Sequence, residues 1–342
     1  MGIQNLNTFL KSRVPNSMRR VHMNIYKGKR IAIDTSIYFY RFLYRNPLYI
    51  ELFLEQIFKL VQNGLSPIYI FDGIPPVEKQ PIIKQRKMRK DNIKDKLKNL
   101  KEELTQIESV PKDTDKDDTE IDNKKKKLTR EINSAERQLI YVTEEHNIQL
   151  KHILTLLGIP FLQANGEADA LCGELVKRDK VDLVLSDDMD LLVDGGNILL
   201  REYNSYSCIV KEYDIDKILK GLNFTKKQWI DFCILCGCDY TTRIPGLGPV
   251  NSYKLIQKEG SLTEVIKKYV GKGKKYNYKG EYPYKKALQL LTESPQFPYD
   301  TINLEKPENI TGNFNELMLY CSVATEYGEN TLNIRLNTIL NR

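Results

Sequence analysis

The sequence predicts an α/β fold built around a mostly parallel, twisted β-sheet. Three short runs, at 30–33, 67–71 and 181–185, are rich in apolar and β-branched residues, which is typical of strands covered on both faces by helices. Helical patterns at 51–62 and 169–180 lie between them, as the crossover connections of a parallel sheet require. The length of 342 residues and a hydrophobic content of 41% suit one large or two modest domains with a packed core.

Each of the three apolar runs leads into carboxylate side chains. Asp34 follows the first run, Asp72 follows the second, and the third continues into Asp188 and Asp190. The carboxyl ends of parallel strands meet at one edge of the sheet, and this edge is where such folds bind ligands. We therefore expect these four acids to lie close together.

Three further acids stand near the starts or ends of predicted helices. Glu167 and Asp169 open the helix expected to run to about residue 180, and Asp239 ends the run at 229–238. Residues two apart do not share a face within a regular helix, so Glu167 and Asp169 can converge only if Glu167 precedes the first helical turn. The positive end of the helix dipole stabilises acids at such a start whether or not they bind a ligand.

Taken together, these acids predict a metal centre. Like charges gathered at one edge repel one another unless a cation lies among them. Oxygen ligands favour Mg²⁺ or Mn²⁺, whereas three histidines and no HExxH motif argue against a histidine-based site. Two such ions about 4 Å apart would stabilise the attacking and leaving oxygens of a phosphodiester. The candidate ligands are Asp34, Asp72, Glu167, Asp169, Asp188, Asp190 and Asp239.

The net charge of +7 is concentrated in one segment. Residues 79–101 contain ten basic and two acidic residues, a local charge of +8, so the rest of the chain sums to about −1. Apolar residues recur there at helical spacing, and a second amphipathic run follows a polar stretch at 110–122 and ends near Gln149. We expect two long helices that stand off the core. Alone, this pattern is typical of a solvated helical hairpin; beside clustered acids, it indicates metal-dependent hydrolysis of nucleic acid.

Two other segments could contact phosphate. The glycine-rich turn at 244–249 opens onto an amphipathic stretch at 250–259, and a turn at a helix start can bind phosphate through its N–H groups. An ordinary connection between two helices gives the same pattern. The stretch at 271–284 is basic with interleaved tyrosines, which is consistent with a loop that touches a phosphate backbone.

The cysteines and the apolar runs bear on location. Cys233 and Cys236 form a CxxC pair without the second pair that a closed zinc site needs, so we expect them to be small apolar residues of a buried helix. No apolar run approaches the roughly 20 residues of a membrane helix, and the first residues do not form a signal sequence. The expectation is an intracellular protein with reduced thiols and no membrane partner.

Six segments, taken in order, resemble the flap endonuclease branch of the XPG family. They are MGIQNLNTFL, IAIDTSIYFYRFLY, PIYIFDGIPPVEKQ, GIPFLQANGEADALCGELV, VLSDDMDLL and LCGCDYTTRIPGLGPVNSYKLIQ, and they cover most of the chain to about Gly260. Each segment alone is weak evidence for the family, but the combination of all six is specific to it. The resemblance implies a PIN-like core, a helical arch over the active site, and a helix–two-turn–helix element that binds duplex DNA.

The resemblance also divides the chain into parts. It implies an N-terminal part of the nuclease core at 1–78, the arch at 79–146, and an internal part of the core at 147–240. Residues 241–342 would then hold the helix–two-turn–helix element and the C-terminal region.

The resemblance assigns roles by position. The ligands of one ion would be Asp34, Asp72, Glu167 and Asp169, and those of the second Asp188, Asp190 and Asp239. Asp169 stands where relatives usually have Glu, so its shorter side chain reaches less far. The catalytic pair that steers the scissile phosphate would be Lys79 and Arg86. The DNA contacts would be Gly2, Tyr40, which matches an aromatic that stacks on a base, Arg243, Gly246 and Gly248.

Two further features depart from the family pattern. Arg243 stands where relatives that bind K⁺ in the helix–two-turn–helix carry a small hydroxyl residue, which leaves the K⁺ site in doubt and offers a direct phosphate contact instead. The C-terminal sequence LNTILNR lacks the box with which relatives dock on the sliding clamp, so this end does not indicate that partner. We expect a monomer.

The function that the resemblance implies is a structure-specific 5′ nuclease, a flap endonuclease with 5′–3′ exonuclease activity as a further expectation. It would use two Mg²⁺ ions, with Mn²⁺ as substitute, on branched or nicked DNA with a 5′ single-stranded flap. Its place would be DNA replication, repair or recombination, in a nucleus or at a viral or cytoplasmic replication site. The alternatives are a Holliday-junction or bubble-type endonuclease of the same family, a catalytically inactive DNA-binding accessory factor, and a plain PIN-type ribonuclease.

Overall fold

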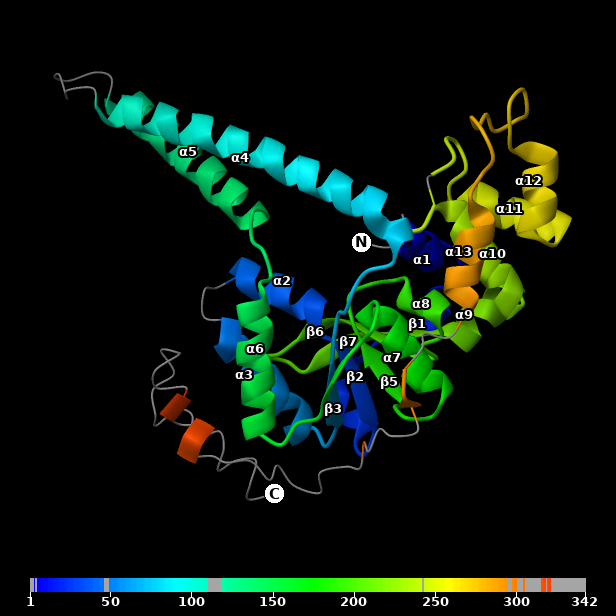
Figure 1. The fold of residues 1–342 in the computed structure, drawn as a ribbon, viewed down its shortest axis with the longest axis horizontal. Helices are drawn as coiled ribbons and strands as arrows, with labels where there is room; N and C mark the ends of the chain where they lie inside the picture. The colour runs from blue at the N-terminus through cyan, green and yellow to red at the C-terminus, as the bar shows by residue number, and fades with distance from the viewer. Residues whose placement is uncertain are drawn as a thin grey trace.

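The computed structural model has a seven-stranded sheet at its centre (Figure 1). The strand order is β1-β7-β6-β5-β2-β3-β4; β2 to β6 pair in parallel, and β7 pairs antiparallel with β1 and β6. This confirms the mostly parallel sheet. The strands are β1 (Met18–His22), β2 (Arg30–Asp34), β3 (Ser66–Phe71), β4 (Phe161–Gln163), β5 (Leu183–Leu185), β6 (Ile198–Asn204) and β7 (Ile209–Asp214). The structure describes residues 3, 5–45, 49–109, 118–241, 243–293, 297–299, 304, 315–317 and 319–320.

Helices cover both faces of the sheet. Ile31 and Ile33 of β2 pack with α2, α3 and α6 on one face, whereas Ala32 packs with α1, α7 and α10 on the other. This alternation gives each strand two apolar faces, as its apolar sequence predicts. The helices are α1 (Leu6–Arg13), α2 (Thr35–Arg45), α3 (Tyr49–Gln62), α4 (Gln80–Glu108), α5 (Asp118–Gln138), α6 (Glu144–Leu156), α7 (Ala168–Lys177), α8 (Leu191–Asp194), α9 (Ile215–Leu222), α10 (Lys226–Cys236), α11 (Pro249–Glu259), α12 (Leu262–Tyr269) and α13 (Tyr284–Thr292).

Helices α4 and α5 form a hairpin that projects from the core (Figure 1). The 29 residues of α4 make it about 44 Å long. Leu100 of α4 packs on Leu128 and Ile132 of α5, a small cluster separate from the core. Ion pairs tie the two helices together as well, at 3.7 Å for Lys96–Glu131, 2.6 Å for Lys101–Glu136 and 2.9 Å for Lys124–Glu103.

The sequence predicts that the second amphipathic run is one helix that ends near Gln149. In the structure this run is divided into two helices. The α5 helix ends at Gln138, and α6 begins at Glu144 after a break. Thr143 causes this restart, because its hydroxyl accepts a hydrogen bond from the backbone N–H of His146 and caps α6. Since α6 packs in the core, the projecting part of the chain ends before it.

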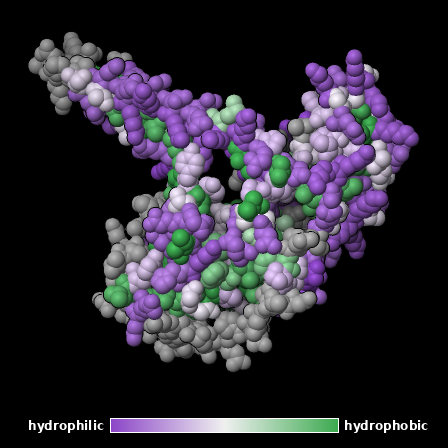
Figure 2. All heavy atoms as spheres, in the orientation of Figure 1, coloured by the Kyte–Doolittle hydropathy of each residue, from purple (hydrophilic) through white to green (hydrophobic). Residues whose placement is uncertain are grey.

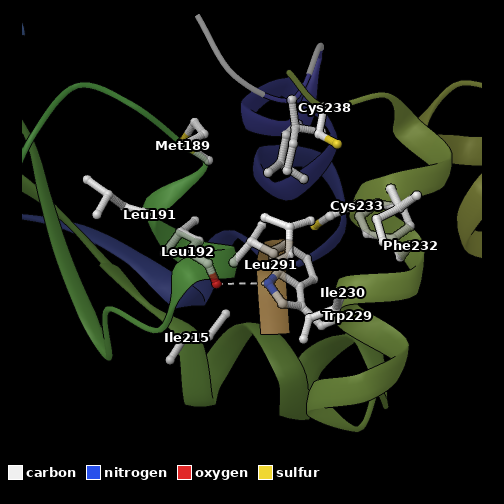
Figure 3. Packing of buried hydrophobic residues seen from close by; sticks show 14 of the residues in the cluster. Met189, Leu191, Leu192, Ile215, Trp229, Ile230, Phe232, Cys233, Cys238 and Leu291 are labelled. Atoms are coloured by element: carbon white, nitrogen blue, oxygen red, sulfur yellow. Dashed lines mark hydrogen bonds between the residues drawn. The ribbon is translucent and has the colours of Figure 1, made fainter. Parts of the chain in front are cut away.

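The buried Trp229 joins two segments that carry candidate site residues (Figure 3). Its side chain is 1% exposed, and Nε1 donates a hydrogen bond to the carbonyl oxygen of Leu192 at 2.9 Å. This contact fixes α10 against α8, and thereby fixes the chain that leads to Asp239 against the chain that follows Asp190. Cys233 and Cys236 are buried in α10, which confirms that they are residues of a buried helix.

Hydrophilic side chains cover most of the visible surface of the hairpin and of the α11–α13 region (Figure 2). Within the parts of the chain that the structure describes, no helix has both the length and the apolar character needed to cross a membrane.

Candidate active site

The carboxyl ends of β2 and β3 bring Asp34 and Asp72 to one edge of the sheet. Asp34 is the last residue of β2, and Asp72 follows the neighbouring parallel strand β3. Asp72 Oδ1 accepts a hydrogen bond from the backbone N–H of Ala168 at 2.8 Å, and Oδ2 accepts one from the hydroxyl of Ser36. Because Ala168 is the first residue of α7, this carboxylate joins the strand end to the helix start.

A glycine after Asp72 allows the chain to pass close to the loop before α7. A Cβ atom at Gly73 would lie 2.1 Å from the carbonyl oxygen of Ala164 and 2.6 Å from that of Asn165. Because glycine has no Cβ atom, the two segments come close enough for the Gly73 N–H to donate a 2.6 Å hydrogen bond to the carbonyl oxygen of Gly166. Any side chain here would separate the two segments that carry the acids.

Glu167 and Asp169 converge in the way the sequence requires. Glu167 is the N-cap of α7 with an extended backbone, at φ −83° and ψ 143°, and Asp169 lies in the first turn. The expectation that Glu167 precedes the helical turns is confirmed. Its carboxylate has two partners, since Tyr240 donates a 2.7 Å hydrogen bond to Oε2 and the Lys79 ammonium contacts Oε1.

Ser186 links Asp34 to the loop that carries Asp188. Its hydroxyl donates a hydrogen bond to Asp34 Oδ2 at 2.8 Å and accepts one from the Asp188 N–H at 3.1 Å. Asp34 is only 5% exposed. Burial, followed by repulsion from Asp72 and Asp188, raises the pKa of Asp34 to about 7, although the hydrogen bond from Ser186 opposes this rise.

Replacing Ser186 with alanine should weaken the binding of divalent cations by about 10- to 100-fold, because an outer partner that orients a ligand typically contributes that much. The loss of the buried hydrogen bond should also lower the free energy of unfolding by about 1–3 kcal/mol. Calorimetric titration with Ca²⁺ and chemical denaturation measure the two effects. Ser207→Ala, in the β6–β7 turn, is the matched control; wild-type affinity for Ca²⁺ in Ser186→Ala would contradict this role.

Lys79 and Arg86 reach the same site from the base of the hairpin. Lys79 ends a short 3₁₀ helix (Val77–Lys79) just before α4, and Arg86 lies in the second turn of α4. Asp239 Oδ2 lies 3.3 Å from Lys79 Nζ and 3.0 Å from Arg86 Nη2. Burial alone lowers the pKa of Lys79, but Glu167, Asp169 and Asp239 together raise it above its usual value, so the side chain stays protonated.

The site residues surround one cavity of about 320 Å³. It lies between the edge of the sheet, the start of α7, the chain after α10, and the base of α4. Among the residues that line it are Asp34, Tyr40, Asp72, Lys79, Arg86, Glu167, Asp169, Asp188 and Asp239.

The chemistry of the cavity fits hard divalent cations. All its candidate ligands are carboxylates, and among the described residues no lysine, arginine or histidine forms an ion pair with Asp34, Asp72 or Asp188. These three repelling charges leave a place for a cation. In the arrangement seen here, Lys79 and Arg86 are the cations beside Glu167 and Asp239, and the described part of the chain contains no group of three or more acidic, histidine or cysteine side chains already arranged to hold an ion.

Other expected residues do not line this cavity. Asp190 is not in its lining, and its Oδ1 accepts a hydrogen bond from the Ile3 N–H at 2.9 Å. Arg243 and Gly248 line a second hollow of about 260 Å³ against α1, and Gly246 lies in the same turn. Gly2 and the C-terminal LNTILNR lie outside the described residues.

Three hydroxyl residues of the site were not predicted from the sequence: Ser36, Ser186 and Tyr240. Each donates to one of the candidate ligands. Ser186 and Tyr240 each had a local signal, since Ser186 directly precedes Asp187 and Asp188, and Tyr240 directly follows Asp239. Ser36 and Tyr240 meet their partners through the fold.

Comparisons with known proteins agree with this geometry. The sequence matches the family models described as the XPG N-terminal domain, over residues 1–93, and the XPG I-region, over residues 158–239. Flap endonuclease 1 of Branchiostoma floridae is 32% identical over 323 residues, which cover 89% of this chain and 78% of the relative. Flap endonuclease 1 of Candida glabrata is 30% identical over 326 residues, with the same coverage.

Solved structures share the fold. The catalytic core of Rad2 superposes with a TM-score of 0.70 at 21% identity, covering 98% of this chain and 99% of the other. Flap endonuclease-1 from Methanococcus jannaschii gives a TM-score of 0.65 at 19% identity, covering 99% and 98%. The sequence identity over 78% of the length of these flap endonucleases and the shared fold show that the chain belongs to the flap endonuclease branch of the XPG family and is a structure-specific 5′ nuclease of DNA processing.

Proposed function

We propose that this nuclease cuts branched or nicked DNA that carries a 5′ single-stranded flap, and that it does so in the cavity at the base of the hairpin. The observation that carries the proposal is the meeting of six carboxylates with Lys79, Arg86 and Tyr40 around one space. Related structures support it: a Rad2 catalytic core is described in complex with DNA substrate, and a GEN1 enzyme in complex with product DNA and an Mg²⁺ ion.

The family is metal-dependent, and we propose two Mg²⁺ ions, with Mn²⁺ as substitute. When bound, the ions would stabilise the charge on the attacking and leaving oxygens of the phosphodiester. Hydrolysis would leave 5′-phosphate and 3′-hydroxyl ends. The proposed ligands are Asp34, Asp72, Glu167 and Asp169 for one ion, and Asp188, Asp190 and Asp239 for the other. Asp190 would have to turn from the Ile3 N–H to take part.

The two cations of the cavity have a second task in this proposal. Lys79 and Arg86 balance Glu167 and Asp239 here, and they would turn to the scissile phosphate once other cations neutralise those acids. A guanidinium and an ammonium side by side suit a phosphate that gains negative charge during the reaction. Tyr40, whose side chain is 43% exposed at the rim, offers its ring to a neighbouring base.

The duplex would be held at the turn before α11. Gly246 has φ +78°, a conformation that favours glycine, and Gly248 is the extended N-cap of the helix, so the turn presents backbone N–H groups. The Arg243 guanidinium lies beside it, with Nη2 3.8 Å from a Cβ built on Gly248. A GEN-1 structure is described as binding potassium; in this chain we infer that Arg243 supplies the positive charge instead. We propose that the enzyme acts as a monomer.

Mapping the products on a double-flap substrate with Mg²⁺ tests the proposal. We expect one principal cut just inside the duplex, because the turn and the cavity hold the two sides of the junction at a fixed spacing. Parallel reactions on nicked, bubble and four-way DNA separate the other family activities. A ladder of products would identify an exonuclease, preferential cutting of bubbles or four-way junctions would identify those branches, and tight binding without cleavage would identify an accessory factor.

A further inference from the structure

A second concentration of positive charge runs from the end of α12, through the connecting loop, to the start of α13. The segment 267–286 contains eight lysines and one acidic residue, Glu281, so its charge of +7 equals that of the whole chain. Four of these lysines project from the connecting loop and are exposed to solvent. We call them the lysine loop: Lys272, Lys274, Lys275 and Lys279.

Tyrosines on the inner side hold this loop in place. Tyr276 is 7% exposed; its N–H donates to the carbonyl oxygen of Tyr269 at 2.9 Å, and its own carbonyl accepts from the Gly271 N–H at 3.0 Å. Tyr282 is 2% exposed and donates to the carbonyl oxygen of Ile234 in α10 at 3.0 Å. Because the tyrosines are buried and the lysines are exposed, the loop presents its charge from a fixed base.

The lysine loop is adjacent to the glycine turn at 244–248. A Cβ atom at Gly246 would lie 3.7 Å from Cδ1 of Tyr276, so the base of the loop packs against that turn. Both loops extend in the same direction from the α10–α13 region (Figure 1). A rod-shaped ligand that contacts one of them would therefore pass close to the other.

The lysines of this loop lack the carboxylate partners found elsewhere. In the hairpin, Lys96, Lys101 and Lys124 each face a glutamate of the opposite helix. Within the described ranges, no carboxylate lies within 4.0 Å of Lys272 or Lys279. Charge that the protein leaves unneutralised is available to a polyanion, whose bound counterions are released when lysines replace them.

We propose that the lysine loop binds the phosphate backbone of the duplex arm, beyond the glycine turn, and lengthens the contact along that arm without reading its sequence. This inference rests on the proposed function, since it assumes that the turn holds duplex DNA. Lysines contact phosphates as point charges and carry no base information, so the contribution should depend on arm length and salt and not on base sequence.

The test is the triple variant Lys272→Gln, Lys275→Gln and Lys279→Gln; Lys274 is retained because its Nζ donates to the carbonyl oxygen of Lys267. Fluorescence anisotropy with Ca²⁺ in place of Mg²⁺ measures binding to substrates whose duplex arm is about half a helical turn or about two turns long. On the long arm, the slope of log K against log salt should fall by about 2–3, since each lost phosphate contact removes about 0.9. On the short arm, the slope should stay at the wild-type value.

A matched control removes the same charge elsewhere. Lys27, Lys59 and Lys180 lie near the amino ends of β2, β3 and β5, at the edge opposite the cavity, and their triple change to Gln should leave the slope unchanged. The triple change of the loop lysines to Arg should preserve the slope, which shows that any loss in the Gln variant comes from charge and not from misfolding.

The outcomes separate this inference from the proposed function. An unchanged slope on the long arm, or an equal loss of affinity for a single strand of the same length, would overturn the duplex assignment even if flaps are cut. A reduced slope on the long arm supports it, even if product mapping assigns the enzyme to another branch of the family.

Discussion

The variant Asp188→Ala should cleave a 5′-flap substrate more than about 100-fold slower than the wild type. Loss of an outer partner of a metal ligand already costs about 10- to 100-fold, so loss of a ligand itself should cost more. Asp188 lines the cavity and is one of the two neighbours whose charge raises the pKa of Asp34. Single-turnover cleavage at saturating enzyme and Mg²⁺ measures the effect on the chemical step.

DNA binding should survive this change. The side chain that is removed is negative, and its loss takes away a repulsion between the cavity and the phosphate backbone, so affinity measured with Ca²⁺ should stay equal or increase. The variant loses the 3.1 Å hydrogen bond that Asp188 Oδ1 accepts from the Asp190 N–H, but the fold should survive, because the hydrogen bond between Ser186 and the Asp188 backbone N–H does not need the side chain. The exposed Asp216 of α9, changed to Ala, is the control. Retained binding with undiminished cleavage would disprove the role of Asp188 in catalysis.

Three neighbouring strands of the sheet and the acids at their ends were predictable from the sequence, and the other four strands were not. The central strands β2, β3 and β5 are apolar because both of their faces are covered, and this leaves a plain signal. At one edge, β1 reads MRRVH, and its charge is explained only by a distant partner: Arg19 Nε lies 2.8 Å from Glu212 on β7. No local pattern reveals such a pair, so β1 and β7 were missed. The three-residue strand β4 and the strand β6, whose sequence ILLREYN is only partly apolar, were missed as well.

The candidate site likewise contains features that the sequence predicts and features that it does not. Glu167 could be placed because helix geometry allows two acids two residues apart to converge only at a helix start. The direction in which the Asp190 side chain points could not be predicted, because its carboxylate accepts a hydrogen bond from the N–H of Ile3, a residue 187 positions away. The partner of Glu167 was equally hidden, because Tyr240 directly follows Asp239 in the sequence but donates its hydrogen bond to Glu167, a residue 73 positions away.

Lys79 allows a sharper test, because two roles predict different results. Its side chain is 14% exposed and lies between Glu167 and Asp239. If it serves only to balance those acids, its removal would let divalent cations bind more tightly and leave the cleavage rate unchanged at saturating Mg²⁺. If it contacts the scissile phosphate, its removal would lower the rate at saturation, whatever happens to cation affinity.

We expect Lys79→Gln to lower the single-turnover rate by about 100- to 1,000-fold, the effect typical of removing one donor that stabilises transition-state charge. Affinity for Ca²⁺, measured by calorimetry, should stay equal or increase, because a competing positive charge leaves the cavity. Lys220→Gln, on the exposed side of α9, should change neither value. A wild-type rate combined with tighter Ca²⁺ binding would show that Lys79 only balances the charge of Glu167 and Asp239. A slower rate with unweakened Ca²⁺ binding would support a contact between Lys79 and the substrate, because the candidate metal ligands all remain in place.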